Sequence, residues 1–278
     1  MPAARRPLTP IVLASLFLLA AIGTAGAQQQ PVAAPAPDQP EFLPRFDFHL
    51  TIDRLLRSQT PQEELVDERF SWDTHYGGSF DLVDYVGGRA TVTADYQAVL
   101  GHEFRPFDPN QANYILEASL SGRTSDRTEI AAIFHHVSRH ISDRPKPFAV
   151  AWNLLGARFL HHAESGTTTF DVAIEGGGVV QRSFVDYSFI TGGQFQARHP
   201  FNAHAGMFLH AEGQVFLLDK DQIGRSGQAG VRIEAGIRLN GRGGAMEVFG
   251  GYERRPDAHP LERLSQRWGL VGLRLLSR

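Results

Sequence analysis

The chain contains no cysteine and, beyond its amino terminus, no long apolar run. The absence of cysteine excludes a disulfide framework, a lipidated amino-terminal cysteine, a thiolate metal site and a thiol nucleophile. Without a second apolar run of about 20 residues, no helical membrane span is expected in the mature chain. The formal net charge is -3, so the chain has no overall positive charge that would favour binding to nucleic acid. With 42% hydrophobic residues, the chain must bury its apolar surface in a core or close it into a barrel.

The amino terminus has the pattern of a cleavable export signal. Arg5-Arg6 precedes an apolar stretch from Leu8 to Ala21, and small residues follow up to Ala25-Gly26-Ala27. This order of charged, hydrophobic and A-x-A parts predicts a signal peptide over residues 1–27. A membrane-anchoring helix is the alternative, but the apolar stretch is shorter than the roughly 20 residues that a span needs.

One domain is expected after a short leader. Residues 28–44 are rich in Gln, Ala and Pro, which predicts an extended or disordered leader. Residues 45–278 form one series of strand-like segments with no second linker. These segments alternate apolar and polar residues over runs of about ten, a pattern typical of a transmembrane β-barrel behind an export signal.

The clearest alternating run extends from Val231 to Asn240. Successive side chains on a strand point to opposite faces, so the run has one apolar and one polar wall. The apolar wall holds Val231, Ile233, Ala235, Ile237 and Leu239, and the polar wall holds Arg232, Glu234, Arg238 and Asn240. The first wall suits lipid and the second suits water.

About twelve segments share this pattern, which predicts an all-β, antiparallel transmembrane barrel of bacterial outer-membrane type. The expected strands are 46–52, 70–85, 90–100, 114–121, 129–140, 148–161, 167–174, 183–197, 203–218, 228–240, 245–252 and 266–276. A secreted soluble barrel or sandwich is the alternative, since period-two patterning alone does not exclude it. Several runs exceed the usual five or six residues of soluble strands, which favours the membrane barrel.

The densest polar cluster lies on the expected strand 129–140. Parity places His136, Ser138 and His140 on one face and Val137 and Arg139 on the other. His136 and Ser138 are about 6.6 Å apart at the backbone, close enough for the imidazole to act as a base toward the hydroxyl. His136 and His140 are about 13 Å apart, too far to share one ion, so no metal site is expected.

The tripeptide from His136 to Ser138 resembles the H-x-S strand element of outer-membrane phospholipases and lipid A deacylases. In those barrels the His and Ser face the lipid and act with a third polar residue. The resemblance implies a lipid or lipopolysaccharide acyl hydrolase with Ser138 as nucleophile, His136 as base and Asn153 or Glu164 as the residue that orients the base. Calcium is implied only by this resemblance. The phospholipase pattern continues with Asn-Gly, where this chain has Arg139-His140.

A longer motif, His136-x-Ser138-x-His140-x-x-Asp143 followed by Asn153, is similar to a strand motif of a family of bacterial outer-membrane proteins known only as a domain of unknown function. This resemblance implies a β-barrel in the bacterial outer membrane. It implies no particular activity.

The polar residues expected in the lumen carry both signs of charge, which predicts ion pairs that fill or narrow the barrel. They are Glu117, Asp171, Glu175, Glu212, Arg232, Glu234, Arg238 and Glu247. If the polar cluster of the strand 129–140 is structural rather than catalytic, His136, Ser138, His140 and Asp143 also line the lumen. The sequence favours a structural, binding or narrow-channel role in the outer membrane, without a cofactor, over the hydrolase. The expected partners are outer-membrane lipids and the barrel-assembly machinery, and the oligomeric state stays open.

Overall fold

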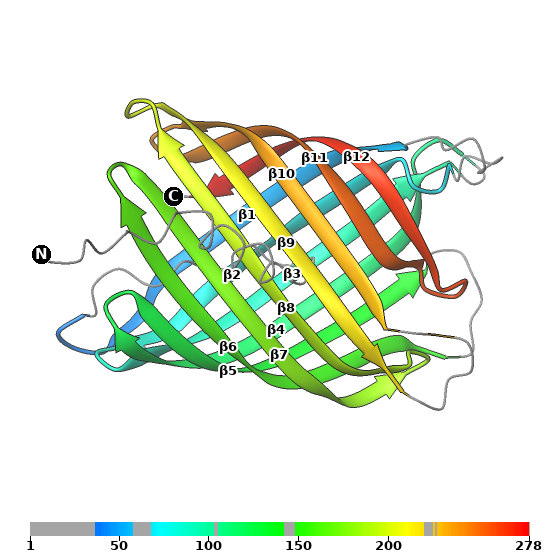
Figure 1. Ribbon diagram of the computed structural model, residues 1–278, viewed down its shortest axis with the longest axis horizontal. Coiled ribbons are helices and arrows are strands. Elements are labelled where there is room, and N and C mark those ends of the chain that lie inside the picture. Colours follow the sequence, from blue (N-terminus) through cyan, green and yellow to red (C-terminus); the bar gives the residue numbers. More distant parts are fainter. Residues whose placement is uncertain are drawn as a thin grey trace, which may run out of the picture.

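The computed structural model describes residues 37–57, 68–102, 105–141, 148–219, 225 and 227–277. Within these ranges, twelve antiparallel strands form one closed barrel (Figure 1). They are β1 (Glu41–Arg57), β2 (Trp72–Tyr85), β3 (Gly88–Gly101), β4 (Asp108–Ser125), β5 (Thr128–Ile141), β6 (Val150–Ser165), β7 (Thr168–Ser183), β8 (Tyr187–Pro200), β9 (Ala205–Leu218), β10 (Gln228–Asn240), β11 (Gly244–His259) and β12 (Leu264–Ser277). The expected signal peptide lies outside the described residues, and β1 begins inside the expected leader.

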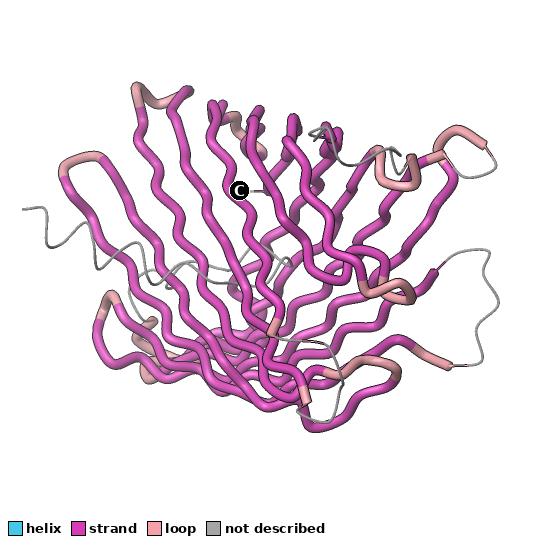
Figure 2. The backbone as a smooth tube through the Cα atoms, turned by 45° about the vertical axis from the view of Figure 1, so that its right-hand side comes forward, coloured by secondary structure: helices cyan, strands magenta, loops and turns pink. Residues whose placement is uncertain are grey.

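Each strand pairs with its sequence neighbours, and β1 also pairs with β12 to close the barrel. At this seam His49 lies opposite Leu276 and Arg57 lies opposite Trp268. Every described strand therefore has two neighbours, and the sheet closes on itself, with residues 49–57 of β1 forming the seam. Figure 2 shows the strands arranged around the barrel interior. The prediction of an antiparallel barrel of about twelve strands is confirmed.

Among the described residues, no helix is long and apolar enough to cross a membrane.

The two ends of the barrel differ in their connections. The start of β1 and the end of β12 lie at one end, together with tight turns such as 86–87 and 126–127. Longer connections, such as 58–71 and 142–149, join strands at the opposite end, which we call the loop end (Figure 1). In outer-membrane barrels the short turns face the periplasm and the longer loops face outward.

The outer wall is apolar and the inner wall is charged, as strand β10 illustrates. Ile233 and Ile237 are 43% and 46% exposed on the outside, whereas Arg232 and Glu234 are buried inside. The predicted split of this strand into a lipid wall and a polar wall is confirmed. Because the apolar outer wall is continuous around the barrel, the soluble alternative is disfavoured.

Ion pairs cross the middle of the interior. Arg232 contacts three carboxylates, at 2.5 Å from Glu234, at 3.0 Å from Glu253 and also at Asp53. On the other side, Arg158 lies 2.6 Å from both Glu117 and Glu175. Arg274 joins Glu234 to Glu247. The predicted network of mixed charges is therefore present.

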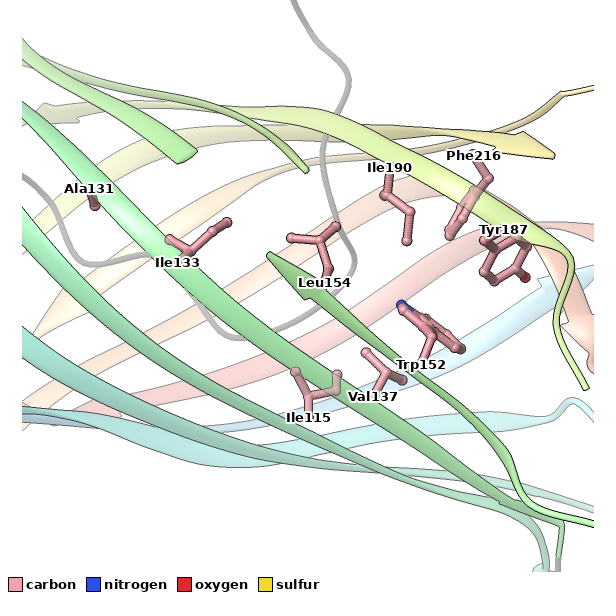
Figure 3. Close-up of a cluster of buried hydrophobic side chains, with 9 residues drawn as sticks. All are labelled: Ile115, Ala131, Ile133, Val137, Trp152, Leu154, Tyr187, Ile190 and Phe216. Carbon is pink, nitrogen blue, oxygen red and sulfur yellow. The ribbon is translucent and has the colours of Figure 1, made fainter. Parts of the chain in front are cut away.

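The loop end of the interior is filled by apolar side chains and by an inward segment of β11. Figure 3 shows Val137 and Trp152 facing Ile190 and Phe216 across the interior. The inward segment comprises residues 255–259, all of them buried, and extends β11 well beyond the expected strand 245–252. Its Asp257 side chain accepts a hydrogen bond from the Tyr187 hydroxyl at 2.7 Å, and its Asp257 carbonyl accepts one from Arg139 at 2.8 Å.

Because ion pairs and this segment occupy the interior, we expect no steady conductance of porin size. A cavity among the described residues, lined by Trp152, Glu212 and Arg255 among others, has a volume of about 70 Å³, enough for a few water molecules. The check is a single-channel recording of the folded protein in a planar lipid bilayer, with a sixteen-stranded porin as the positive control. Stable current steps of the porin's size would contradict the expectation.

Candidate functional site

His136, Ser138 and His140 lie on the outer face of β5. The inward parity of this strand belongs to Glu129, Ile133 and Val137, which are buried inside the barrel. The expectation that the three polar residues line the lumen is therefore wrong. The alternation correctly separates two faces of β5, but the more polar face at this end of the strand is the one that faces outward.

Asn153 of β6 holds His136. The two residues are direct partners in the register of β5 and β6, and His136 Nδ1 lies 2.5 Å from Asn153 Oδ1. An amide oxygen only accepts, so the Nδ1–H donates this bond. In the neutral imidazole the second nitrogen, Nε2, then carries the lone pair, which is the form needed by a general base.

Gln181 of β7 extends the chain of polar groups by one strand. It lies opposite Asn153, whose Nδ2 donates to Gln181 Oε1 at 2.8 Å. This bond fixes the amide so that Asn153 Oδ1 faces His136. A bulge between β6 and β7 leaves Val180 unpaired and turns Gln181 outward, although its parity with Val179 alone would place it inside.

Ser138 lies beside both histidines on the same face. Its hydroxyl Oγ forms a hydrogen bond with His140 Nε2 at 3.1 Å. His136 is two residues away in the other direction along β5. Ser138 sits opposite Tyr114 of β4 and Ala151 of β6, three residues before β5 ends at Ile141 near the loop end.

An aromatic row adjoins the serine. Tyr76, Tyr96 and Tyr114 occupy neighbouring positions on β2, β3 and β4, with ring centroids 4.9 and 5.1 Å apart. The ring of His140 packs against Tyr114 at 5.1 Å with an interplanar angle of 88°. Aromatic rows of this kind mark the interface between lipid and water in outer-membrane barrels.

The wall around this polar group is apolar. Leu116, Phe134 and Leu155 flank His136 on β4, β5 and β6, and they are 49%, 41% and 53% exposed. The polar residues therefore form an isolated patch on a surface that otherwise suits hydrocarbon.

The other predicted site residues fall elsewhere. Arg232, Glu234 and Arg238 point inward and form ion pairs, as the lumen interpretation expects. Glu164 lies eleven residues beyond Asn153 along β6, roughly 36 Å away, where it contacts His162. It is thus too distant to orient His136, and that alternative is wrong. Asp143 lies outside the described residues.

The described neighbours of Ser138 do not fit a calcium site. Their side chains offer amide, hydroxyl, phenol and imidazole groups, whereas calcium prefers several carboxylate and carbonyl oxygens. No group of three or more His, Cys, Asp or Glu residues that could hold a metal ion occurs in the described part of the chain.

No family model matches the chain, so the resemblance to the family of unknown function is not shown, and no curated protein matches it. Solved structures do match. The outer membrane phospholipase A from Escherichia coli is 13% identical with a TM-score of 0.51, over 85% of this chain and 97% of its own. The Salmonella typhi outer membrane phospholipase, solved as a dimer with bound calcium, is 13% identical with a TM-score of 0.50, over 82% and 90%. The chain therefore has the fold of these outer-membrane β-barrels.

Proposed function

We propose that this barrel resides in the bacterial outer membrane and hydrolyses acyl ester bonds of lipids, with Ser138 as nucleophile, His136 as base and Asn153 as the residue that orients the base. One observation carries the proposal: His136, Asn153 and Gln181 form a hydrogen-bonded chain on the lipid-facing wall, and Ser138, which bonds to His140, lies two residues from His136 on the same face. This places the hydrolase ahead of the structural or narrow-channel role that the sequence favours.

The position of the patch is hard to explain as structure alone. Polar groups on the lipid face cost a barrel free energy, most at the middle of the membrane and less toward the interface, where the tyrosine row lies. A structural role for His136 and Ser138 would place them in the charged interior, where many partners are present. Outside the barrel, the substrate itself supplies a reason for their exposure.

The proposed reaction uses the tautomer of His136 that its contact with Asn153 favours. Ser138 Oγ attacks the acyl carbonyl carbon while His136 Nε2 takes the hydroxyl proton. The carbonyl electron pair moves to its oxygen, and on its return the bond to the alcohol oxygen breaks. The departing alcohol receives the proton from His136. Water then repeats the sequence on the acyl-Ser138 ester and releases the fatty acid, which regenerates both residues.

The depth of Ser138 indicates where the substrate lies. It is three residues from the loop end of β5, level with the row of tyrosines. In a barrel whose longer loops face outward, this level is the interface of the outer leaflet, where the acyl esters of phospholipid and lipopolysaccharide lie. The two matched phospholipases support a lipid ester as substrate. Since the described residues do not fit calcium, no step is assigned to it.

The test is acyl release by the mature protein folded in detergent. Vesicles of phosphatidylethanolamine and purified lipopolysaccharide are separate substrates, each assayed with calcium and with EDTA. Release from either substrate, together with labelling of Ser138 by a fluorophosphonate, is expected. A barrel that migrates as folded in an unheated gel but neither releases acyl chains nor reacts with the probe would restore the structural role.

A further inference from the structure

We infer that the side chain of His140 stabilises the oxyanion of the transition state, by donating a hydrogen bond from Nε2 to the former carbonyl oxygen of the substrate. This inference rests on the proposed hydrolase function. It assigns different tasks to the two histidines that flank Ser138: His136 moves the proton, and His140 meets the negative charge.

The geometry places a nitrogen of His140 at the reacting atoms. Nε2 lies 3.1 Å from Ser138 Oγ. When Oγ bonds to the acyl carbon, the oxyanion forms two bonds away from Oγ, within reach of a donor that already contacts it. Preorganised donors at this position are among the largest contributors to acyl transfer.

The second histidine is needed as a donor rather than as a second base. The bond to Asn153 leaves the lone pair of His136 at Nε2, so in the proposed reaction that nitrogen takes the proton of Ser138, two residues away on the same face. A serine hydroxyl donates one hydrogen bond and accepts others. The bond between His140 and Ser138 is complementary to this arrangement when Nε2–H of His140 donates and Oγ accepts.

The aromatic row holds the donor in place. The ring of His140 packs edge to face against Tyr114, which in turn packs against Tyr96. A donor whose ring is held by packing requires little reorganisation when charge develops. The hydrogen-bond partners that the structure gives Ser138 and His136 are His140 and Asn153, so neither contact involves a carboxylate that would bring a cation to the same position.

The inference is tested with two variants of His140. His140→Phe keeps an aromatic ring against Tyr114 but removes the donor, and kcat for a soluble acyl ester should fall about 10²-fold with little change in KM, since the lost bond exists only in the transition state. His140→Gln keeps an N–H donor and should recover part of that loss. Both variants are assayed in EDTA.

The matched control is His161→Phe. His161 also lies on the outer face and stacks on Phe159, but at the opposite end of β6 from Asn153, so its replacement should leave kcat unchanged. If His140→Phe retains wild-type kcat while Ser138 still reacts with a fluorophosphonate, the role of His140 is wrong and the hydrolase stands. An unreactive, inactive wild-type protein overturns both. If His140→Phe does not fold, His140→Ala and His140→Gln carry the same comparison.

Discussion

Replacing Ser138 by Ala should abolish acyl release, with a loss of about 10⁴-fold or more in kcat. The variant removes the only atom that forms the covalent bond, whereas His136 and Asn153 keep their contact. Little stability should be lost, because Ser138 lies on the outer wall and is not part of the interior packing. The measurement is fatty acid released per folded barrel over time, with gel mobility before heating as the check on folding.

Ser183→Ala is the matched control for that loss. Ser183 also lies near the loop end, on β7, where it pairs with Ala151 of β6. Its hydroxyl donates a hydrogen bond to the carbonyl of Ala149 at 2.8 Å. Its removal tests whether the loss of any hydroxyl at this level slows the reaction. Equal losses in the two variants would assign the effect to the local surface and would argue against Ser138 as the nucleophile.

Arg232→Met should lower the free energy of unfolding by about 3–5 kcal/mol. Met occupies a similar length without charge, so Asp53, Glu234 and Glu253 each lose a cationic partner while they stay buried. Glu234 and Glu253 keep Arg274 and Arg255 as partners, so the main cost comes from Asp53, whose buried charge loses its guanidinium partner. Urea unfolding of the barrel in lipid vesicles, followed by fluorescence of its three tryptophans, measures the change.

Arg45→Met is the comparison for the ion-pair prediction. Arg45 lies 2.7 Å from Asp47, but these side chains are 29% and 38% exposed. Exposed pairs contribute about 0–1 kcal/mol, so the two variants should differ several-fold in their effect. Similar shifts for both would mean that the interior network around Arg232 contributes no more to stability than a surface pair.

The sequence was sufficient for the barrel because its outer wall repeats one physical pattern. Strand β10 illustrates this: its expected bounds, 228–240, match the structure, and its alternation gives the correct lipid and lumen walls. Elsewhere the boundaries shifted. The glycines at 176–178 lie between two expected strands, but β7 continues through them. Gly177 lies so close to the backbone of β6 at Gly156 that any side chain would clash, so glycine permits the two strands to pair here.

The structural interpretation placed the polar cluster of β5 on the wrong wall, whereas the phospholipase resemblance implied the lipid side. Parity grouped His136 with Ser138 correctly, and the assumption that polar means lumen then assigned them to the wrong side. The strand itself carries a signal for the outer wall. Ile130 and Phe134 lie on the same face as His136 and Ser138, whereas Glu129 lies on the opposite face.

Gln181 could not have been found from the pattern. The bulge at Val180 changes which face Gln181 occupies, and a single extra residue leaves no mark in the alternation of a strand rich in glycine. The inward segment of β11 is similar: its burial depends on contacts with Gln111 and Arg139, both far away in the sequence.

The seam between β1 and β12 has a consequence for biosynthesis. Strand β1 is synthesised first, but one of its two neighbours is β12, the last strand of the barrel. The barrel therefore closes only after β12 has been synthesised. A product that stops short of β12 exposes the bare backbone of β1 and β11 to hydrocarbon, where each unsatisfied amide costs several kcal/mol. Insertion of such a fragment into a bilayer is therefore unfavourable, so the pairing of the two ends ties membrane insertion to the presence of all twelve strands.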